Sequence, residues 1–430
     1  MGIYSYEEAF GAADRTGSAM RKAIANWFDL YYGKSQGGDP CQRIPYTVVS
    51  KIVRTVFGEY SATAPDPFWQ GVLDRLQPVA RQAMELTLVG GSCFIKPCPD
   101  GTGFSFTLIP RNNVLIFGTD SRGNVTDIGT VEKSIHGRWY YTLLERRQVD
   151  KDGYLTIQNK LYRAMNRESL GVQVPLTSHP DYARLSQCYR FEKPVHSVGL
   201  VALRTPMLNC VDGSAEGVSV YAPAVELIAA IDENEAQLRG EFQRGQSRVI
   251  VSRDLLKPGG GLEDHLFVGL DEDPEQVGIT VFAPQLRQQA FLARKQEYLR
   301  NVESVIGLKR GMLSDANVEE RTATEIASSA GDYNLTVMDF QRMWDQGVAA
   351  VLQLCGILAE IYQLAKPAKP VFSVDWGNGI LYDEAAQWAE YLEMVKAGIL
   401  KPEVALGWRF GMAADTPQQQ SAVREKYMPQ

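Results

Sequence analysis

Hydrophobic residues recur along this chain at two different spacings, and the spacing changes at residues 90–91, a Gly-Gly pair. Before that pair they recur every three or four residues, which is the period of a helix packed on one face. The pattern predicts helices over residues 1–32, 44–60 and 68–88. Pro78 lies inside the third range, where it removes a hydrogen bond, so two shorter helices or one kinked helix both fit.

After the Gly-Gly pair, short apolar runs rich in β-branched and aromatic residues are separated by turn residues, which is typical of strands. One of these turns contains Pro99, Asp100 and Gly101, a hairpin signal. The strands are predicted at 93–96, 104–109, 114–117, 128–134, 138–148 and 154–163. Strands and helices occupy separate stretches, so residues 90–205 are predicted to form an antiparallel β region in an α+β protein, without a βαβ repeat.

The next stretch is a helix, a small insert and a second helix. The two helices are predicted over 221–242 and 284–306, the second ending at Gly307. The insert between them, residues 246–283, carries seven acidic and three basic residues. Its strands are predicted at 248–252, 266–270 and 277–282.

A long helix is predicted to follow. The residues Thr322-Ala-Thr-Glu325 have the form of a capping box, and apolar residues then recur at helical spacing as far as Tyr362. A helix of about 45 residues would be roughly 65 Å long. That exceeds the width of a small domain, so neighbours are needed along its length, which favours an oligomer.

The remainder of the chain is predicted to contain a strand at 371–376 and helices at 383–397 and 402–410. The tail from Asp415 is polar, and we expect it to be frayed.

Composition excludes several classes of function. The formal net charge is −7, whereas a protein that binds nucleic-acid phosphates tightly usually carries a basic domain, so sequence-specific DNA binding is not expected. No apolar run reaches the roughly 18 residues of a transmembrane helix, and the first ten residues lack the order of a secretory signal, so no membrane partner is expected. Six cysteines are too few and too scattered for a disulfide framework.

Candidate metal and catalytic residues lack the necessary spacing. Cys41, Cys93 and Cys98 do not form a Cys-x-x-Cys pair with a second pair of ligands, so buried thiols are the expected role. The four histidines are isolated from any nucleophile motif. No cofactor or metal is therefore expected.

Two charged groups remain as candidate contact sites. One is an acidic cluster that could hold a divalent cation but lacks the glycine and distal glutamate of an EF-hand, which favours a solvated or partner-facing surface. Its members are Asp271, Glu272, Asp273 and Glu275. The other consists of Lys309 and Arg310, in the loop between two long helices, which either contact a phosphate backbone or form a plain solvated connection.

Five local segments follow one another in a characteristic order: residues 44–57 (IPYTVVSKIVRTVF), 90–97 (GGSCFIKP), the segment 209–232, residues 321–326 (RTATEI) and 398–403 (GILKPE). In this order they resemble phage portal proteins of the SPP1-like type, over about residues 20–412. The chain stops soon after Phe410, so the helical crown of some family members is expected to be small or absent.

The resemblance implies an α+β portal-type subunit divided into named parts. The parts are an α/β wing (1–220), stem helix 1 (221–245), a small α/β clip (246–283), stem helix 2 (284–307), a tunnel loop (308–320), a long helix (321–366) and a wing strand with a short C-terminal helical region (367–430). The tunnel loop would face DNA through Lys309, Arg310, Gly311, Met312 and Leu313. The acidic cluster would then be the clip's partner surface.

The resemblance also implies a role and partners. Such proteins form a ring, usually of twelve subunits, at one capsid vertex of the virion, and assemble in the host cytoplasm. Double-stranded DNA passes through the ring non-specifically, and the ring contacts the large terminase subunit, a head–tail adaptor, and the major capsid and scaffold proteins. They have no catalytic activity of their own. Two alternatives stay open: a hydrolase acting in the β region, and another capsid-associated head–tail adaptor.

Overall fold

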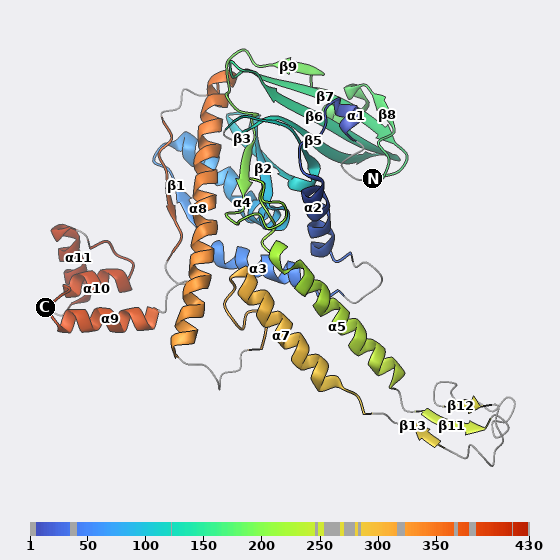
Figure 1. The fold of residues 1–430 in the computed structure, drawn as a ribbon. Helices are drawn as coiled ribbons and strands as arrows, with labels where there is room; N and C mark the ends of the chain where they lie inside the picture. Colours follow the sequence, from blue (N-terminus) through green and yellow to red (C-terminus); the bar gives the residue numbers. More distant parts are fainter. Residues whose placement is uncertain are drawn as a thin grey trace. The chain divides into compact units, whose positions relative to one another are not determined.

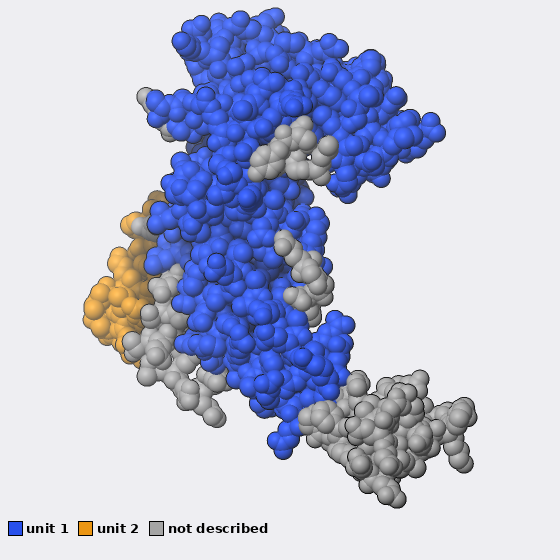
Figure 2. Space-filling view, turned by 45° about the vertical axis from the view of Figure 1, so that its right-hand side comes forward, with its two compact units in different colours: residues 1–53, 64–372 blue, residues 54–63, 373–430 orange. Residues whose placement is uncertain are grey.

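The computed structural model describes residues 6–34, 41–121, 123–245, 248–252, 267–270, 280–282, 285–315, 323–364, 369–377, 384–414 and 416–428. The chain forms two compact units (Figure 2): unit 1 comprises residues 1–53 and 64–372, and unit 2 comprises residues 54–63 and 373–430. Each unit is described separately below.

The N-terminal region is helical, as predicted, but in separate pieces. The helices are α1 (Glu7–Phe10), α2 (Ser18–Tyr31), α3 (Ile44–Val56) and α4 (Pro67–Gly90). The prediction of one helix over residues 1–32 is wrong, because Gly11 ends α1 in the left-handed conformation, with φ of 68°. The predicted apolar face of α2 is confirmed, since its four residues are all buried: Ile24, Trp27, Phe28 and Tyr31.

The helix α4 is continuous through Pro78. Its first turn is capped by the side chain of Asp66, which accepts from the backbone N–H of Phe68 at 2.8 Å, and Pro67 occupies the first turn, where no N–H is needed. Buried residues lie on both sides of the proline, including Leu76 and Ala80. Packing along the whole length therefore holds the two halves in one helix.

Two antiparallel sheets form the β region of unit 1. The strands are β2 (Ser92–Asp100), β3 (Gly103–Pro110), β4 (Val114–Thr119), β5 (Val125–His136), β6 (Trp139–Val149), β7 (Leu155–Ala164), β8 (Val172–Val174), β9 (Cys188–Arg190) and β10 (Val201–Arg204). One sheet has the order β10-β2-β3 and the other β4-β5-β6-β7-β8, with β9 also paired to β7. In the described residues, 3-10 turns occur at Arg111–Asn113, Leu176–Ser178 and Pro180–Tyr182, and a further one at Ala222–Ala224 precedes the next helix. The predicted antiparallel region and the α+β class are confirmed.

Buried charged groups tie this region together. Glu145 on β6 is 5% exposed and binds both Lys96 on β2, at 2.7 Å, and its neighbour Arg147, at 2.7 Å. Burial raises the pKa of the Glu145 carboxyl, but the positive charges of Arg147 and Lys96 outweigh this and lower it to about 2. Separately, buried Arg111 forms a two-pronged ion pair with Glu216 at 3.0 to 3.1 Å.

The helices and the insert predicted over 221–366 are present. In chain order they are α5 (Val225–Arg244), β11 (Arg248–Ser252), β12 (Phe267–Leu270), β13 (Thr280–Phe282), α7 (Gln288–Ile306) and α8 (Ala323–Tyr362). The three strands form one small sheet, with β11 parallel to β12 and antiparallel to β13. Figure 1 shows α5 and α7 side by side and α8 beside the β region, where it contacts β2, β10 and α4. In the described part of the chain no helix has the length and apolar character needed to cross a membrane.

Unit 2 pairs a short strand from each of its two segments. The strands β1 (Ser61–Thr63) and β14 (Ser373–Asp375) are antiparallel. Three helices follow: α9 (Glu384–Lys396), α10 (Pro402–Arg409) and α11 (Pro417–Tyr427). The prediction of a frayed tail is wrong, because Thr416 and Gln419 form a capping box at the start of α11 and Phe410 stacks on Tyr427 at 4.3 Å.

Candidate functional site

The helices α5 and α7 form an antiparallel pair with a narrow apolar seam. Each helix buries one side at only a few positions, and the remaining residues are largely exposed or half-buried. The buried residues are Ile228, Ile231, Asn234 and Leu238 on α5, and Leu299, Val302, Glu303 and Ile306 on α7. Two of these eight are polar: Asn234 bonds across the pair to α7, whereas Glu303 bonds to the segment that follows α7.

Polar contacts join the pair along its length. Near the insert, Arg287 and Glu241 form a two-pronged ion pair, with a shortest distance of 2.7 Å, and the hydrogen bond from Arg287 lowers the pKa of Glu241. Further along, Lys295 binds Glu235 at 3.0 Å, and the amide of Asn234 donates to the carbonyl of Phe291 at 3.2 Å. These contacts fix the register of α5, which precedes the small sheet in the chain, against α7, which follows it.

The segment after α7, residues 307–315, folds back on the end of that helix; we call it the α7 loop. Gly307 ends α7 in the left-handed conformation, with φ of 78°. The N–H of Leu308 then donates to the carbonyl of Glu303 at 2.8 Å, and the Leu308 side chain is buried. The N–H of Met312 donates to the carbonyl of Lys309 at 3.1 Å, which closes a turn around Arg310.

The Glu303 carboxylate lies inside this loop. Glu303 is 1% exposed. Its Oε1 accepts the backbone N–H groups of Gly311 at 3.1 Å, of Leu313, and of Ser314 at 2.9 Å, while its Oε2 accepts the Ser314 hydroxyl at 2.8 Å. A buried carboxylate is costly unless such donors satisfy it, and here four donors do so.

The predicted site residues of the tunnel loop differ in their exposure to solvent. Lys309 and Arg310 are exposed, whereas Gly311, Met312 and Leu313 are half-buried. Residues 316–320 of the predicted tunnel loop lie outside the described residues, and so does the whole acidic cluster of Asp271, Glu272, Asp273 and Glu275.

Sequence reasoning missed Glu303. It lies on the same face as the buried residues Leu299, Val302 and Ile306. A charged residue on the apolar face of a predicted helix was the available signal, because such a residue requires partners when it is buried.

The length of α8 does not by itself require a second copy of the chain. Its buried residues extend from Tyr333 to Ala359, and its neighbours there include β2, β10 and α4 of the same unit. Within the described residues the chain supplies neighbours to this helix itself, so the length of the helix alone does not carry the inference of an oligomer.

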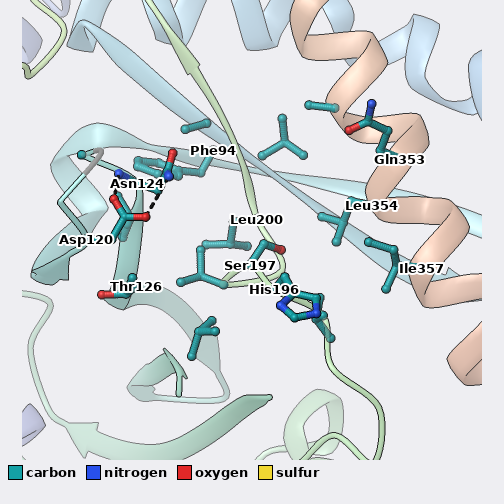
Figure 3. A pocket seen from close by; sticks show the side chains of 18 of the residues that line it. Phe94, Asp120, Asn124, Thr126, His196, Ser197, Leu200, Gln353, Leu354 and Ile357 are labelled. Atoms are coloured by element: carbon teal, nitrogen blue, oxygen red, sulfur yellow. Dashed lines mark hydrogen bonds between the residues drawn. The ribbon is translucent and has the colours of Figure 1, made fainter. Parts of the chain in front are cut away.

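A cavity of about 750 Å³ opens between α8 and the loop before β10. Figure 3 shows Gln353, Leu354 and Ile357 of α8 on one side of it, and His196 and Ser197 on the other. The Ser197 hydroxyl accepts the N–H of Gly199 at 3.2 Å, a bond within its own turn. Within the described part of the chain no serine at this cavity bonds a histidine, so the cavity gives no support to the hydrolase alternative.

The other candidate ligands are dispersed. Cys93 is buried, which raises the pKa of its thiol to about 12, and Cys41 and Cys98 are half-buried. His179 packs against the ring of Tyr182 at 4.6 Å and is buried. Among the residues that the structure describes, no three His, Cys, Asp or Glu side chains gather as a metal site would require.

The fold thus defines a mixed α+β protein in which a helical pair carries a small sheet and is followed by a long helix. Residues 124–425, more than two thirds of the chain, match the family model described as phage portal protein, SPP1 Gp6-like, and the chain belongs to this family. The predicted family is confirmed. A comparison with curated proteins gave no match. Phage portal proteins are a structural family, and membership implies an oligomeric ring associated with the capsid of the virion.

Proposed function

We propose that this chain forms the ring at one capsid vertex through which double-stranded DNA is packaged and ejected. The observation that carries the proposal is the family match over residues 124–425. On this reading α5 and α7 are the stem, residues 246–283 are the clip that docks the terminase and then the head–tail connector, and the α7 loop begins the tunnel loop. The wing contacts the major capsid and scaffold proteins, twelve subunits form the ring, and the chain has no catalytic role.

The charge of the chain supports passage of DNA without tight binding. The net charge is −7, and α5 alone carries five acidic and two basic residues. An acidic wall repels phosphates at short range, so DNA can slide without being held. Lys309 and Arg310 are an exposed cationic pair at the far end of α7 from the small sheet. We propose that they touch the DNA backbone transiently.

A double substitution, Lys309→Ala with Arg310→Ala, tests this role. Rings should still form, as measured by sedimentation, because neither side chain is buried. Packaging or retention of DNA should fall several-fold. The binding of DNA by the ring should also depend less on salt, since each lost phosphate contact lowers the slope of log K against log salt concentration by about one.

The matched control is Lys151→Ala with Arg167→Ala, which removes two exposed cations from the β region. It should leave both ring formation and packaging unchanged. Packaging by the Lys309 and Arg310 variant at the level of this control would exclude a DNA-contacting role for the pair.

A further inference from the structure

We infer that Glu303 is the residue that positions the α7 loop, and that it holds Lys309 and Arg310 at a fixed place at the end of α7. Nothing in the family match assigns a role to this residue. The inference rests on the proposed function insofar as it concerns DNA, whereas the positioning itself is a property of the chain.

Glu303 binds the loop on both sides of the cationic pair. Before the pair, its backbone carbonyl accepts from Leu308 at 2.8 Å. After the pair, its carboxylate accepts from Gly311, Leu313 and Ser314. The chain between these attachment points is only Lys309 and Arg310, so their backbone has little freedom while both sets of bonds are present.

A second residue on the same face of α7 extends the attachment. Gln296, seven residues before Glu303 and so two helical turns away, accepts the N–H of Asp315 at 2.8 Å through its Oε1. The loop is thus attached along two turns of α7 by side chains, and not only at the point where the helix ends.

A carboxylate suits this position because of the donors that meet there. Three backbone N–H groups and one hydroxyl converge on Glu303, and Ser314 is itself buried. An apolar side chain of similar size would leave those donors without acceptors, which is unfavourable in a site shielded from water. A loop that needed only to connect two helices would not require this arrangement.

The test uses assembled rings carrying Glu303→Ala, Glu303→Gln or the control Glu297→Ala. Glu297 lies on the same helix, but its side chain is 63% exposed. Hydrogen–deuterium exchange of residues 308–315 reports the attachment, and DNA packaging reports its consequence. We expect Glu303→Ala to speed exchange at Gly311, Leu313 and Ser314 at least tenfold, while α5 and the sheets keep their protection.

Packaging by the Glu303→Ala ring should fall to the level of the Lys309 and Arg310 double variant, and combining all three substitutions should cause no further loss, because one function is removed by two routes. Glu303→Gln should lie between wild type and Glu303→Ala, since its Oε1 still accepts the backbone N–H groups. Glu297→Ala should match wild type in both measurements.

The two measurements separate failure of this inference from failure of the proposed function. Unchanged exchange in Glu303→Ala would overturn the positioning role outright. The role would also be overturned if Glu303→Ala exchanges faster but packages normally while the Lys309 and Arg310 double variant fails to package. Faster exchange with normal packaging in both variants would retain the attachment and reject the DNA role. If Glu303→Ala does not assemble, Ser314→Ala removes the single hydroxyl bond, and unchanged exchange there and in Glu303→Gln would overturn the inference.

Discussion

Replacing Glu145 with Gln should destabilise unit 1 in a pH-dependent manner. The substitution keeps the shape of the side chain but removes the charge that neutralises buried Arg147 and half-buried Lys96. Both cations would then lack a counter-charge in a site where Glu145 is 5% exposed. Removing the carboxylate from this group is unfavourable because the Arg147 charge stays buried.

The size of the effect follows from the pKa. Burial alone would raise the pKa of Glu145 above its usual value of 4.5. The charges of Arg147 and Lys96 have the larger, opposite effect, and the resulting pKa is about 2. This difference corresponds to about 3 kcal/mol of stability. Because the folded-state pKa is depressed, that stability is fully present above pH 4.5 and is lost as the pH falls toward 2. The entropy of unfolding is ~2.1 cal/mol/K per residue, so losing this stability should lower the Tm of a unit of this size by about 4 °C.

Thermal unfolding at fixed protein concentration, between pH 7 and pH 3, measures this. The Tm of Glu145→Gln should lie about 4 °C below wild type at pH 7, and the gap should narrow as the pH falls below 4.5. Glu192→Gln, at an exposed position, is the control and should change the Tm by less than about 1 °C. A gap at pH 7 no larger than that of the control, or one that does not change with pH, would refute the reasoning.

Two further substitutions test the packing of unit 1. Gly91→Ala should destabilise the chain by more than the roughly 1–2 kcal/mol that the left-handed conformation costs a residue with a side chain, because its Cβ would lie 2.2 Å from the carbonyl oxygen of Gly217. The control is Gly101→Ala, which is also at positive φ but has open space around it, and equal Tm losses in the two variants would contradict the clash. Arg111→Met should cost about 3 kcal/mol by leaving Glu216 without its cationic partner, and a Tm within 1 °C of wild type would contradict a cost of that size.

Local patterns allowed much of the β region to be predicted. The hairpin between β2 and β3 closes where Asp100 pairs with Gly103, and the next long hairpin closes where His136 pairs with Trp139. Turn residues and alternating side chains are local signals, so one sequence suffices to place them. The apolar faces of α2 and α8 were predictable for the same reason.

The features that escaped prediction depend on contacts between elements, which the spacing of apolar residues along one element does not show. Pro78 left the form of its helix open, and packing on both sides of it decided for one helix. The polar tail gave no apolar stripe, yet Arg424 of α11 pairs with Glu403 of α10. Glu303 received no role because its hydrogen bonds depend on how the following loop turns back, which periodicity does not reveal.

Electron microscopy of the purified protein, viewed down the symmetry axis, tests the central claim most directly. We predict closed rings with a central channel, in which α5 and α7 surround the channel and the α7 loop, with Lys309 and Arg310, lies at its wall. A chain that stays monomeric at all concentrations and forms no rings in infected-cell lysates would contradict it, as would a ring whose channel is walled by the β-sheets.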